Sequence, residues 1–569
     1  MVLAFMISKR LGRLLLLLIG CVLQLSASYA VNVEITGIKG SVLENVQYRL
    51  NELYENKPIS QEPVEALKEQ ITKAMYPYGF FQPTITIYPA GKRLQIYIIP
   101  GPQMRINSLN VRLQGEGADN AEIKQAMRDL PIKVGQPLLN HRYEEAKDML
   151  SNAAEHQGYL HAFFEKSEIL IDRQHYTADI TLIFNTGPQY YFGQIRFDPT
   201  YISPELLHRY VPFKYGEPYS TDQILALETT LSASGYFKSV IVKPNIDSIR
   251  HVPVDVHLER VHRINYSLGI GYGTDTGPRG RAGLDIMPVN RSGHKFNAIA
   301  QGSFKENALL AQYIIPGQNP VTDKYSVTGS LSNLNYSSGY GNSLLLSVAK
   351  QHVKKNHQRM ISLNALNERF NYTGEPKTTK SLLFPKAMFT WSQISDPLFS
   401  PSGYNITLTG LAASKAVLSE INVAQAFIDV KAAFTAEMIR TRFFFHAIQG
   451  FTLINNVDNL PLSLALLLGG AEDLKAYSYN SVGPGKILSF AGMEIQKETF
   501  KKWYLIGFVD GGDVYKPSLK DFKYDAGIGL MWVSPVGPIK VGIAQPINNH
   551  FNCIQGRNPK LVINMGPDL

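Results

Sequence analysis

The sequence has no long apolar segment and comparatively little charge. None of its apolar runs reaches the about 18 residues that a membrane-spanning helix needs, so a bundle of membrane helices is excluded. Charged residues make up 18% of the chain, against about 25% in soluble domains. In their place stand 30 Tyr, 27 Phe and 45 Gly. This composition favours a transmembrane β-barrel, whose strands alternate apolar and polar residues.

Cysteine is also scarce, with only Cys21 and Cys553 in 569 residues. Residues 1–30 have the pattern of a secretory signal peptide: basic residues, an apolar core and a small-x-small site that ends at Ala30. We expect cleavage after Ala30, which leaves Cys553 alone and allows no internal disulfide. The segment Leu18-Ile19-Gly20-Cys21 also fits a lipoprotein cleavage site, so acylation at Cys21 is the alternative.

Signatures of catalysis and of nucleic-acid binding are missing as well. The formal net charge is +9, and three basic residues lie in the leader, which leaves +6 (9 − 3) on the mature chain. No basic stripe accompanies this charge, so we expect no nucleic-acid partner. The chain has no Gly-x-Ser-x-Gly, no His-Glu-x-x-His and no paired cysteines. We therefore expect no enzymatic activity, no cofactor and no metal site.

The N-terminal half contains a sequence repeat. Three segments share the order proline, helix, glycine-aromatic: Pro58 with Gly79-Phe80, Pro137 with Gly158-Tyr159, and Pro218 with Gly235-Tyr236. Apolar residues recur at helical spacing before each glycine: Val64, Leu67, Ile71 and Met75; Tyr143, Ala146, Leu150 and Ala153; Ile224, Leu227 and Leu231. Each glycine follows its helix, where a left-handed cap is favoured. We predict three β-α-α-β-β repeats at residues 31–101, 102–187 and 188–261.

Such α/β repeats have two interpretations that spacing alone does not separate. They can form a rigid spacer. Alternatively, each small sheet can leave an edge strand free to pair with an extended client chain.

From about Ile264 the periodicity changes from helical to alternating. Ile264, Tyr266, Leu268, Ile270 and Tyr272 alternate with polar residues and with Gly269, Gly271 and Gly273. One face therefore suits lipid and the other a polar lumen. At roughly 10 residues per tilted strand plus connections, residues 262–569 have room for about 16 strands. The predicted fold is thus α+β repeats followed by a 16-stranded antiparallel transmembrane β-barrel.

Several segments resemble one known family. These are residues 267–277, the segment Asp396-Pro397-Leu398-Phe399-Ser400-Pro401-Ser402-Gly403-Tyr404, residues 532–538 and the terminal Gly566-Pro567-Asp568-Leu569. Together they are similar to the outer-membrane assembly superfamily of BamA, TamA and the two-partner secretion pores, over essentially the whole mature chain. Its members carry periplasmic POTRA (polypeptide-transport-associated) repeats before a 16-stranded barrel. Three repeats fit the TamA branch better than the BamA or secretion-pore branches.

The resemblance implies a location and a function. It implies a barrel in the cell outer membrane, POTRA repeats in the periplasm, and help with inserting unfolded outer-membrane proteins, autotransporters included. It also implies a partner, a TamB-like protein anchored in the inner membrane that spans the periplasm. The alternative is a two-partner-type secretion or diffusion pore that conducts through the lumen. A large, steady single-channel conductance would favour the pore.

One family motif departs from its usual form. The superfamily's sixth extracellular loop folds into the barrel and carries [VI]-Arg-Gly-[FY], whereas this chain has Leu474-Lys475-Ala476-Tyr477. The partner motif Phe-x-Asp-x-Gly is present, with Phe508 and Asp510. Lysine is a point charge and does not reproduce the bidentate arginine fork. The resemblance therefore implies loop anchoring by Lys475, Tyr477, Phe508 and Asp510, with a Lys475–Asp510 pair that is looser than the family's.

The resemblance also directs attention to the seam between the first and last strands. Gly269, Gly271 and Gly273 weaken the first strand, and Pro567 after Gly566 donates no hydrogen bond. We predict a lateral seam that opens for a client strand, with Leu268 near Ile563. The alternative is that the three glycines only make room for the infolded loop.

Overall fold

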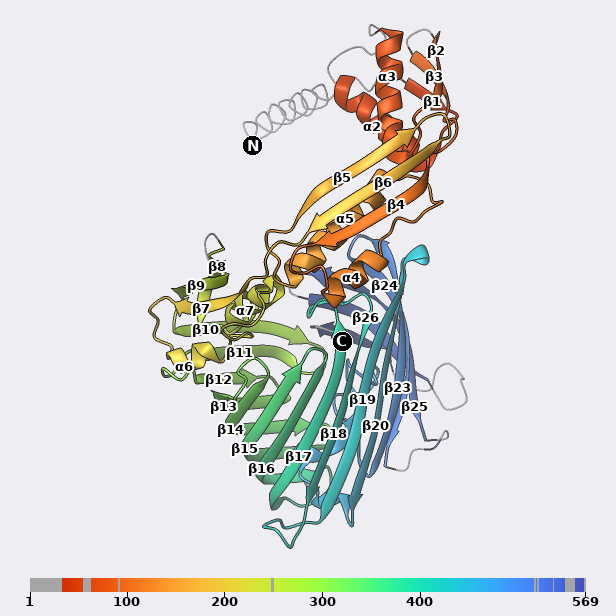
Figure 1. Ribbon diagram of the computed structural model, residues 1–569. Coiled ribbons are helices and arrows are strands. Elements are labelled where there is room, and N and C mark those ends of the chain that lie inside the picture. Colours follow the sequence, from red (N-terminus) through yellow and green to blue (C-terminus); the bar gives the residue numbers. More distant parts are fainter. Residues whose placement is uncertain are drawn as a thin grey trace, which may run out of the picture. The chain divides into compact units, whose positions relative to one another are not determined.

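The chain is described by a computed structural model (Figure 1). The structure describes residues 33–54, 63–90, 93–246, 250–515, 518, 521–535, 537–547 and 558–566. The leader at 1–30, both cysteines, Pro58 and Pro567 lie outside these ranges, so the expectations about cleavage, acylation and Pro567 stay predictions. Within these ranges no helix is both long and apolar enough to cross a membrane.

Two compact units make up the described chain. The first contains the residues up to Arg196 together with Phe213–Leu225 and Lys243–Asp255. The second contains Phe197–Pro212, Ala226–Val242 and the residues from Val256 onward. The third repeat therefore contributes to both units.

Each of the three repeats has the predicted order of strands and helices, and they are drawn from red to yellow-green in Figure 1. The first repeat consists of β1 (Val33–Thr36), α2 (Gly40–Tyr54), α3 (Val64–Met75), the short 3-10 helix η2 (Tyr76–Tyr78), β2 (Thr84–Ala90) and β3 (Arg93–Ile99). The second consists of β4 (Arg105–Gln114), α4 (Ala121–Arg128), α5 (Asn140–His156), β5 (Phe163–Asp172) and β6 (Thr177–Asn185). The third consists of β7 (Tyr191–Phe197), α6 (Pro204–His208), α7 (Thr221–Ala233), β8 (Phe237–Pro244) and β9 (His251–Arg260). The last strand of each repeat lies in the middle of its sheet, in the orders β1-β3-β2, β4-β6-β5 and β7-β9-β8.

The predicted apolar stripes form the cores of the repeats. All of their residues are buried except two. Val64 is exposed because it is the first residue of α3, and Ala153 is half-buried while its neighbour Ala154 takes the buried position. Gly79, Gly158 and Gly235 have φ angles of 83°, 84° and 77°, the left-handed conformation predicted for them.

The helical part of the third repeat joins the barrel within the second unit. Ser203 N donates to Arg291 O at 2.8 Å, just before α6. Lys295 Nζ donates to Ser234 O at 2.6 Å and lies 4.9 Å from the centre of the Tyr236 ring. Lys295 thus binds the carboxyl end of α7, where a cation is favoured.

Sixteen strands of the described residues form one antiparallel sheet, drawn from green to blue in Figure 1. They are β10 (Ile264–Gly273), β11 (Gly277–Ile286), β12 (Lys295–Gly302), β13 (Glu306–Pro316), β14 (Asp323–Tyr336), β15 (Gly339–Lys354), β16 (His357–Tyr372), β17 (Thr378–Ile394), β18 (Gly403–Ala413), β19 (Val423–Ala436), β20 (Thr441–Ile454), β23 (Ile487–Phe500), β24 (Trp503–Val514), β25 (Lys523–Ser534), β26 (Gly537–Ile547) and β27 (Lys560–Met565). Neighbours in sequence are neighbours in the sheet, and β20 pairs with β23 across a long connection. This is the predicted 16-stranded barrel.

Candidate functional site: the lumen loop and the barrel seam

The connection between β20 and β23, residues 455–486, folds into the barrel; we call it the lumen loop. It contains η4 (Val457–Asn459), η5 (Leu462–Leu464), β21 (Leu466–Leu468) and β22 (Val482–Gly485). Leu460 packs in one apolar cluster with residues of β16 to β19, whereas Leu468 and Leu474 pack in another with residues of β23 and β24. The loop is therefore held against two separate parts of the barrel wall.

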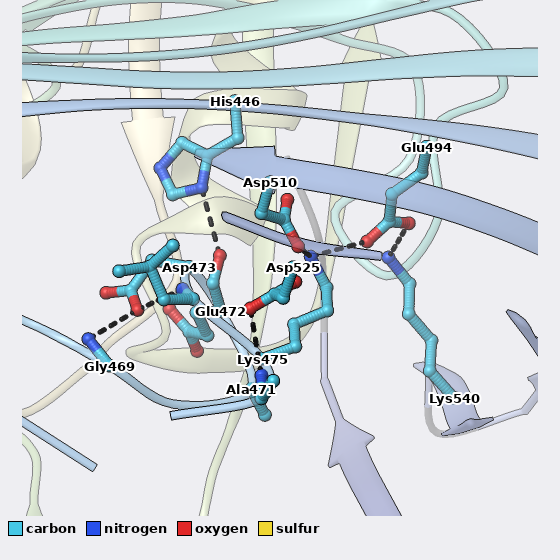
Figure 2. Close-up of polar contacts among 12 residues, drawn as sticks. His446, Gly469, Ala471, Glu472, Asp473, Lys475, Glu494, Asp510, Asp525 and Lys540 are labelled. Carbon is cyan, nitrogen blue, oxygen red and sulfur yellow. Dashed lines mark hydrogen bonds and ion pairs between the residues drawn. The ribbon is translucent and has the colours of Figure 1, made fainter. Parts of the chain in front are cut away.

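Lys475 lies at the centre of a buried ionic cluster inside the barrel (Figure 2). Its Nζ is 2.8 Å from Asp510 Oδ2 on β24 and 3.5 Å from Glu494 Oε1 on β23. It also lies 4.8 Å from the centre of the Phe508 ring. The Lys475 side chain is 9% exposed and that of Asp510 1%. The pair predicted from the sequence is present, and the charges are shielded from bulk water.

Further polar contacts fix the same stretch of loop. Lys540 Nζ on β26 contacts Glu494 at 2.7 Å, so two ammonium groups face this carboxylate. Ala476 N donates to Asp525 Oδ2 at 2.9 Å, and Asp525 lies opposite Asp510 in the β24–β25 register. Glu472 O is 3.1 Å from a ring nitrogen of His446 (Figure 2). A second lysine and bonds to the loop backbone therefore add to the anchor. Asp510 Oδ1 is nevertheless buried without a hydrogen-bond partner among the described residues, as expected where a lysine stands in place of a bidentate arginine.

The two end strands of the sheet, β10 and β27, meet without a backbone ladder among the described residues. Their contacts lie at one end of the seam. Ile563 N donates to Thr274 Oγ1 at 3.0 Å, and Lys560 Nζ contacts Asp275 Oδ1 at 2.7 Å. The lumen loop bridges the same point, because Lys560 Nζ also donates to Tyr477 O at 2.8 Å and Asp275 Oδ2 accepts from Ala471 N.

These contacts correct the predicted register of the seam. Ile563 lies beside Thr274, six positions along the chain from Leu268, which is about 20 Å at the rise of a strand. Leu268 itself is 89% exposed. The prediction that Leu268 faces Ile563 was therefore wrong, because β27 has six residues and begins beside the turn that follows β10.

The glycines of β10 do not make room for the lumen loop. A Cβ atom on Gly271 would meet no atom within 4 Å, and one on Gly269 would meet only Arg281 Cβ at 3.9 Å. At Gly273 the crowding atoms belong to Arg279 and Thr276 of the adjoining hairpin. The alternative that the three glycines make room for the lumen loop therefore lacks the contact with that loop that it requires. Gly566 has a φ of 136°, and its N donates to Pro538 O at 3.1 Å, so the end of β27 is tied to β26.

Known families match both parts of the chain. The Omp85 superfamily domain matches residues 291–566, from the connection before β12 to the end of β27. The barrel is an Omp85 superfamily domain. The first POTRA domain of TamA matches residues 32–100, and the POTRA family described as a surface antigen variable number repeat matches residues 190–260. The chain is an Omp85 outer-membrane protein with its POTRA repeats in the periplasm.

A solved structure shares this architecture. BamA from Haemophilus ducreyi lacking POTRA domains 1–3 is similar at 15% identity and a TM-score of 0.66, over 81% of this chain and 98% of that one. CdiB from Escherichia coli is similar at 12% identity and a TM-score of 0.48, over 81% of this chain and 90% of that one. The likeness to BamA shows a shared fold.

A second segment contacts the inner wall of the Omp85 barrel near its periplasmic end, the end at which β10 begins. It is the β17–β18 connection, residues 395–402. Arg442 on β20 is 1% exposed and donates to Ser400 O at 3.1 Å and Pro401 O at 3.2 Å. Its guanidinium carbon lies 4.8 Å from the centre of the Phe399 ring. Phe399 packs on the same apolar cluster as Ala471 and Ala476 of the lumen loop, so the segments approach each other from opposite ends.

A chain of polar contacts connects these two segments. Arg442 Nη1 donates to Gln496 Oε1 at 2.8 Å, and Gln496 Nε2 donates to Glu494 Oε2 at 2.8 Å. Glu494 in turn contacts Lys475.

The sequence reasoning missed four of the charged residues of this region: Glu494, Asp525, Lys540 and Arg442. Their signal is weak but present, since each is a charged residue at a lumen-facing position of a strand whose other face is apolar.

Proposed function

We propose that this Omp85 protein helps insert β-barrel proteins, autotransporters included, into the outer membrane through the seam between β10 and β27, without making or breaking covalent bonds. The observation that carries the proposal is the open edge of β10, which forms a ladder with β11 and with no other described strand. Tyr266, Leu268 and Ile270 are 79%, 89% and 97% exposed on its lipid-facing side. An unpaired strand edge is a template for another strand, which can hydrogen-bond to its free N–H and C=O groups.

The way the seam is held supports transient opening. Its polar contacts involve Thr274, Asp275 and Lys560, all at the extracellular end. The Lys560–Asp275 pair is mostly shielded, with side chains that are 27% and 5% exposed, but it holds only this end of the seam. Toward the periplasm β10 has no ladder with β27 among the described residues, so a client strand can pair along it there. Because Asp275 and Lys560 also bind the lumen loop, a movement of that loop would loosen the seam.

The proposed partners are unfolded outer-membrane proteins and a TamB-like protein that spans the periplasm. The match of residues 32–100 to the first POTRA domain of TamA supports the second of these. Each repeat sheet ends on a strand with one open edge among the described residues, namely β2, β5 and β8. Such edges suit pairing with an extended chain.

Conduction through the lumen is the competing function, and it has less support. The lumen loop packs against two parts of the wall, and the β17–β18 connection is hydrogen-bonded to Arg442, which is buried inside the barrel. A pore function would require the lumen loop to leave the barrel. Low and intermittent conductance in planar bilayers is expected, whereas a large, steady conductance would favour the pore.

A reversible disulfide across the seam tests the proposal. In a Cys553→Ser background, Thr274→Cys is combined with Ile563→Cys and with its neighbours until oxidation forms the crosslink. Val327→Cys with Val348→Cys, a directly opposite pair on the outer face of β14 and β15, is the control. Oxidation should abolish autotransporter assembly in the seam variant, reduction should restore it, and the control should assemble normally in both states. Normal assembly by the locked seam variant would refute the seam as the route.

A further inference from the structure

The outer face of the barrel carries a polar belt near the extracellular ends of β13 to β17. One cross-strand row consists of directly opposed residues: Asn307, Asn333, Asn342, Arg369 and Thr379. The next row toward the membrane centre consists of Leu309, Leu331, Leu344, Asn367 and Ser381. We call these ten residues the amide belt. It places hydrogen-bonding groups directly above three adjoining leucines.

Hydrogen bonds hold amide side chains of the belt in place, whereas the cation of the belt, Arg369, has no partner among the described residues. Asn333 Nδ2 donates to Asn342 Oδ1 at 2.7 Å and to Tyr340 Oη at 2.6 Å. Neither row contains a carboxylate. Within the described residues the Arg369 guanidinium makes no hydrogen bond or ion pair, and the side chain is exposed. The belt therefore presents an uncompensated positive charge beside fixed amide groups.

The position of the belt matches the boundary between lipid chains and head groups. On β15 the outward residues between Lys350 and Asn342 are Leu344, Leu346 and Val348, all of them exposed. The eight residue steps from Lys350 to Asn342 extend about 26 Å along the strand. At a strand tilt of about 35–45° this spans about 20 Å of height, most of the about 25 Å apolar band of such barrels. Arg369 pairs with Asn342 in register, so it lies at the extracellular edge of that band.

The surface of the belt contains a depression, and the belt is confined to one part of the barrel rim. An open depression of about 600 Å³ is lined by Asn333, Asn342 and Arg369 together with Leu309, Leu331 and Leu344. At the extracellular ends of β18 to β20 the corresponding outward row is apolar, with Ala412 opposite Ala424 and Ala424 opposite Leu453. The amide belt is thus not a general property of the barrel rim.

We propose that the amide belt binds a phosphorylated glycolipid of the outer leaflet. Amide side chains suit sugar hydroxyls, which both donate and accept hydrogen bonds. The guanidinium of Arg369 suits a phosphate, which it can bind in a bidentate manner. The leucine row suits the first methylenes of the acyl chains. A plain anionic phospholipid would use the arginine and the leucines and leave the row of amides without partners.

Lipid retention in nanodiscs tests this inference. The full-length protein is reconstituted in phosphatidylcholine nanodiscs that contain a small fraction of diphosphoryl lipid A, and bound lipid is counted by native mass spectrometry after release into mild detergent. Arg369→Gln should reduce retention about tenfold, as expected for losing a charge-assisted hydrogen bond. Arg359→Gln is the matched control, because Arg359 lies on the same strand and the same face at the periplasmic end.

Two lipid substitutions complete the test. Lipid A with its phosphates removed should be retained by the unchanged protein about as weakly as lipid A is by Arg369→Gln. Phosphatidylglycerol should be retained weakly by both proteins. Equal loss in Arg369→Gln and Arg359→Gln, undiminished retention in Arg369→Gln, or equally strong retention of phosphatidylglycerol would overturn the proposal. Because lipid retention requires no client, these results are independent of the assembly assay.

Discussion

Lys475 holds the lumen loop by a buried charge pair instead of an arginine fork. Replacing it with alanine removes the cation between Asp510 and Glu494 and leaves Lys540 paired with Glu494. Removing one partner of a buried pair costs about 3–5 kcal/mol, because the other charge stays shielded and uncompensated. Lys475→Ala should therefore loosen the loop and expose Leu474, which is fully buried in the folded protein.

Limited proteolysis followed by mass spectrometry measures this loosening. New cleavage near Leu474 is expected in Lys475→Ala and in Asp510→Ala. Lys486→Ala is the control, since Lys486 belongs to the same loop and its exposed side chain donates to Asn455 O. Unchanged cleavage in both Lys475→Ala and Asp510→Ala would mean that the buried pair does not hold the loop.

The β17–β18 connection is held in place by hydrogen bonds from one buried side chain, Arg442. Arg442→Gln would leave the carbonyls of Ser400 and Pro401 and the amide of Gln496 short of a donor inside the barrel. Each unsatisfied buried group costs about 1–3 kcal/mol. We expect the midpoint of heat unfolding, followed by the shift of the barrel band on gels, to fall by several degrees.

The matched control for this prediction is the nearby Arg440→Gln. Arg440 is exposed and pairs with Glu498 at 3.1 Å, a surface contact worth about 0–1 kcal/mol. Its unfolding midpoint should stay near that of the unchanged protein. Equal unfolding midpoints for Arg442→Gln and Arg440→Gln would contradict the prediction that Arg442 stabilises the barrel by holding residues 395–402.

The sequence predicted the helices and strands better than it predicted the contacts between elements that are far apart in the chain. Helical and alternating periodicities are local signals, and they located the three repeats and the barrel strands. The Lys475–Asp510 pair was found through a family motif. The Asp275–Lys560 contact joins residues 285 positions apart, and no local pattern reveals it. The register between β10 and β27 was predicted wrongly, because register depends on strand length and on turns at the far end.

At the scale of the whole molecule, the seam, the lumen loop and the periplasmic connection form one connected system. The loop binds both sides of the seam through Asp275 and Lys560, and its Lys475 connects through Glu494 and Gln496 to Arg442. The open edge of β10 is the part of this system that a client would meet. The central claim is that clients pair with that edge.

Site-specific photocrosslinking during assembly tests this claim most directly. A photoreactive amino acid at Ile270, on the open edge of β10, should capture an autotransporter client while it is being inserted. The same amino acid at Val348, which faces lipid in the middle of the sheet and is 59% exposed, should not capture it. Client adducts from Ile270 and not from Val348 are the predicted result. Equal capture at the two positions, or no capture at Ile270 in protein that assembles clients normally, would contradict the account.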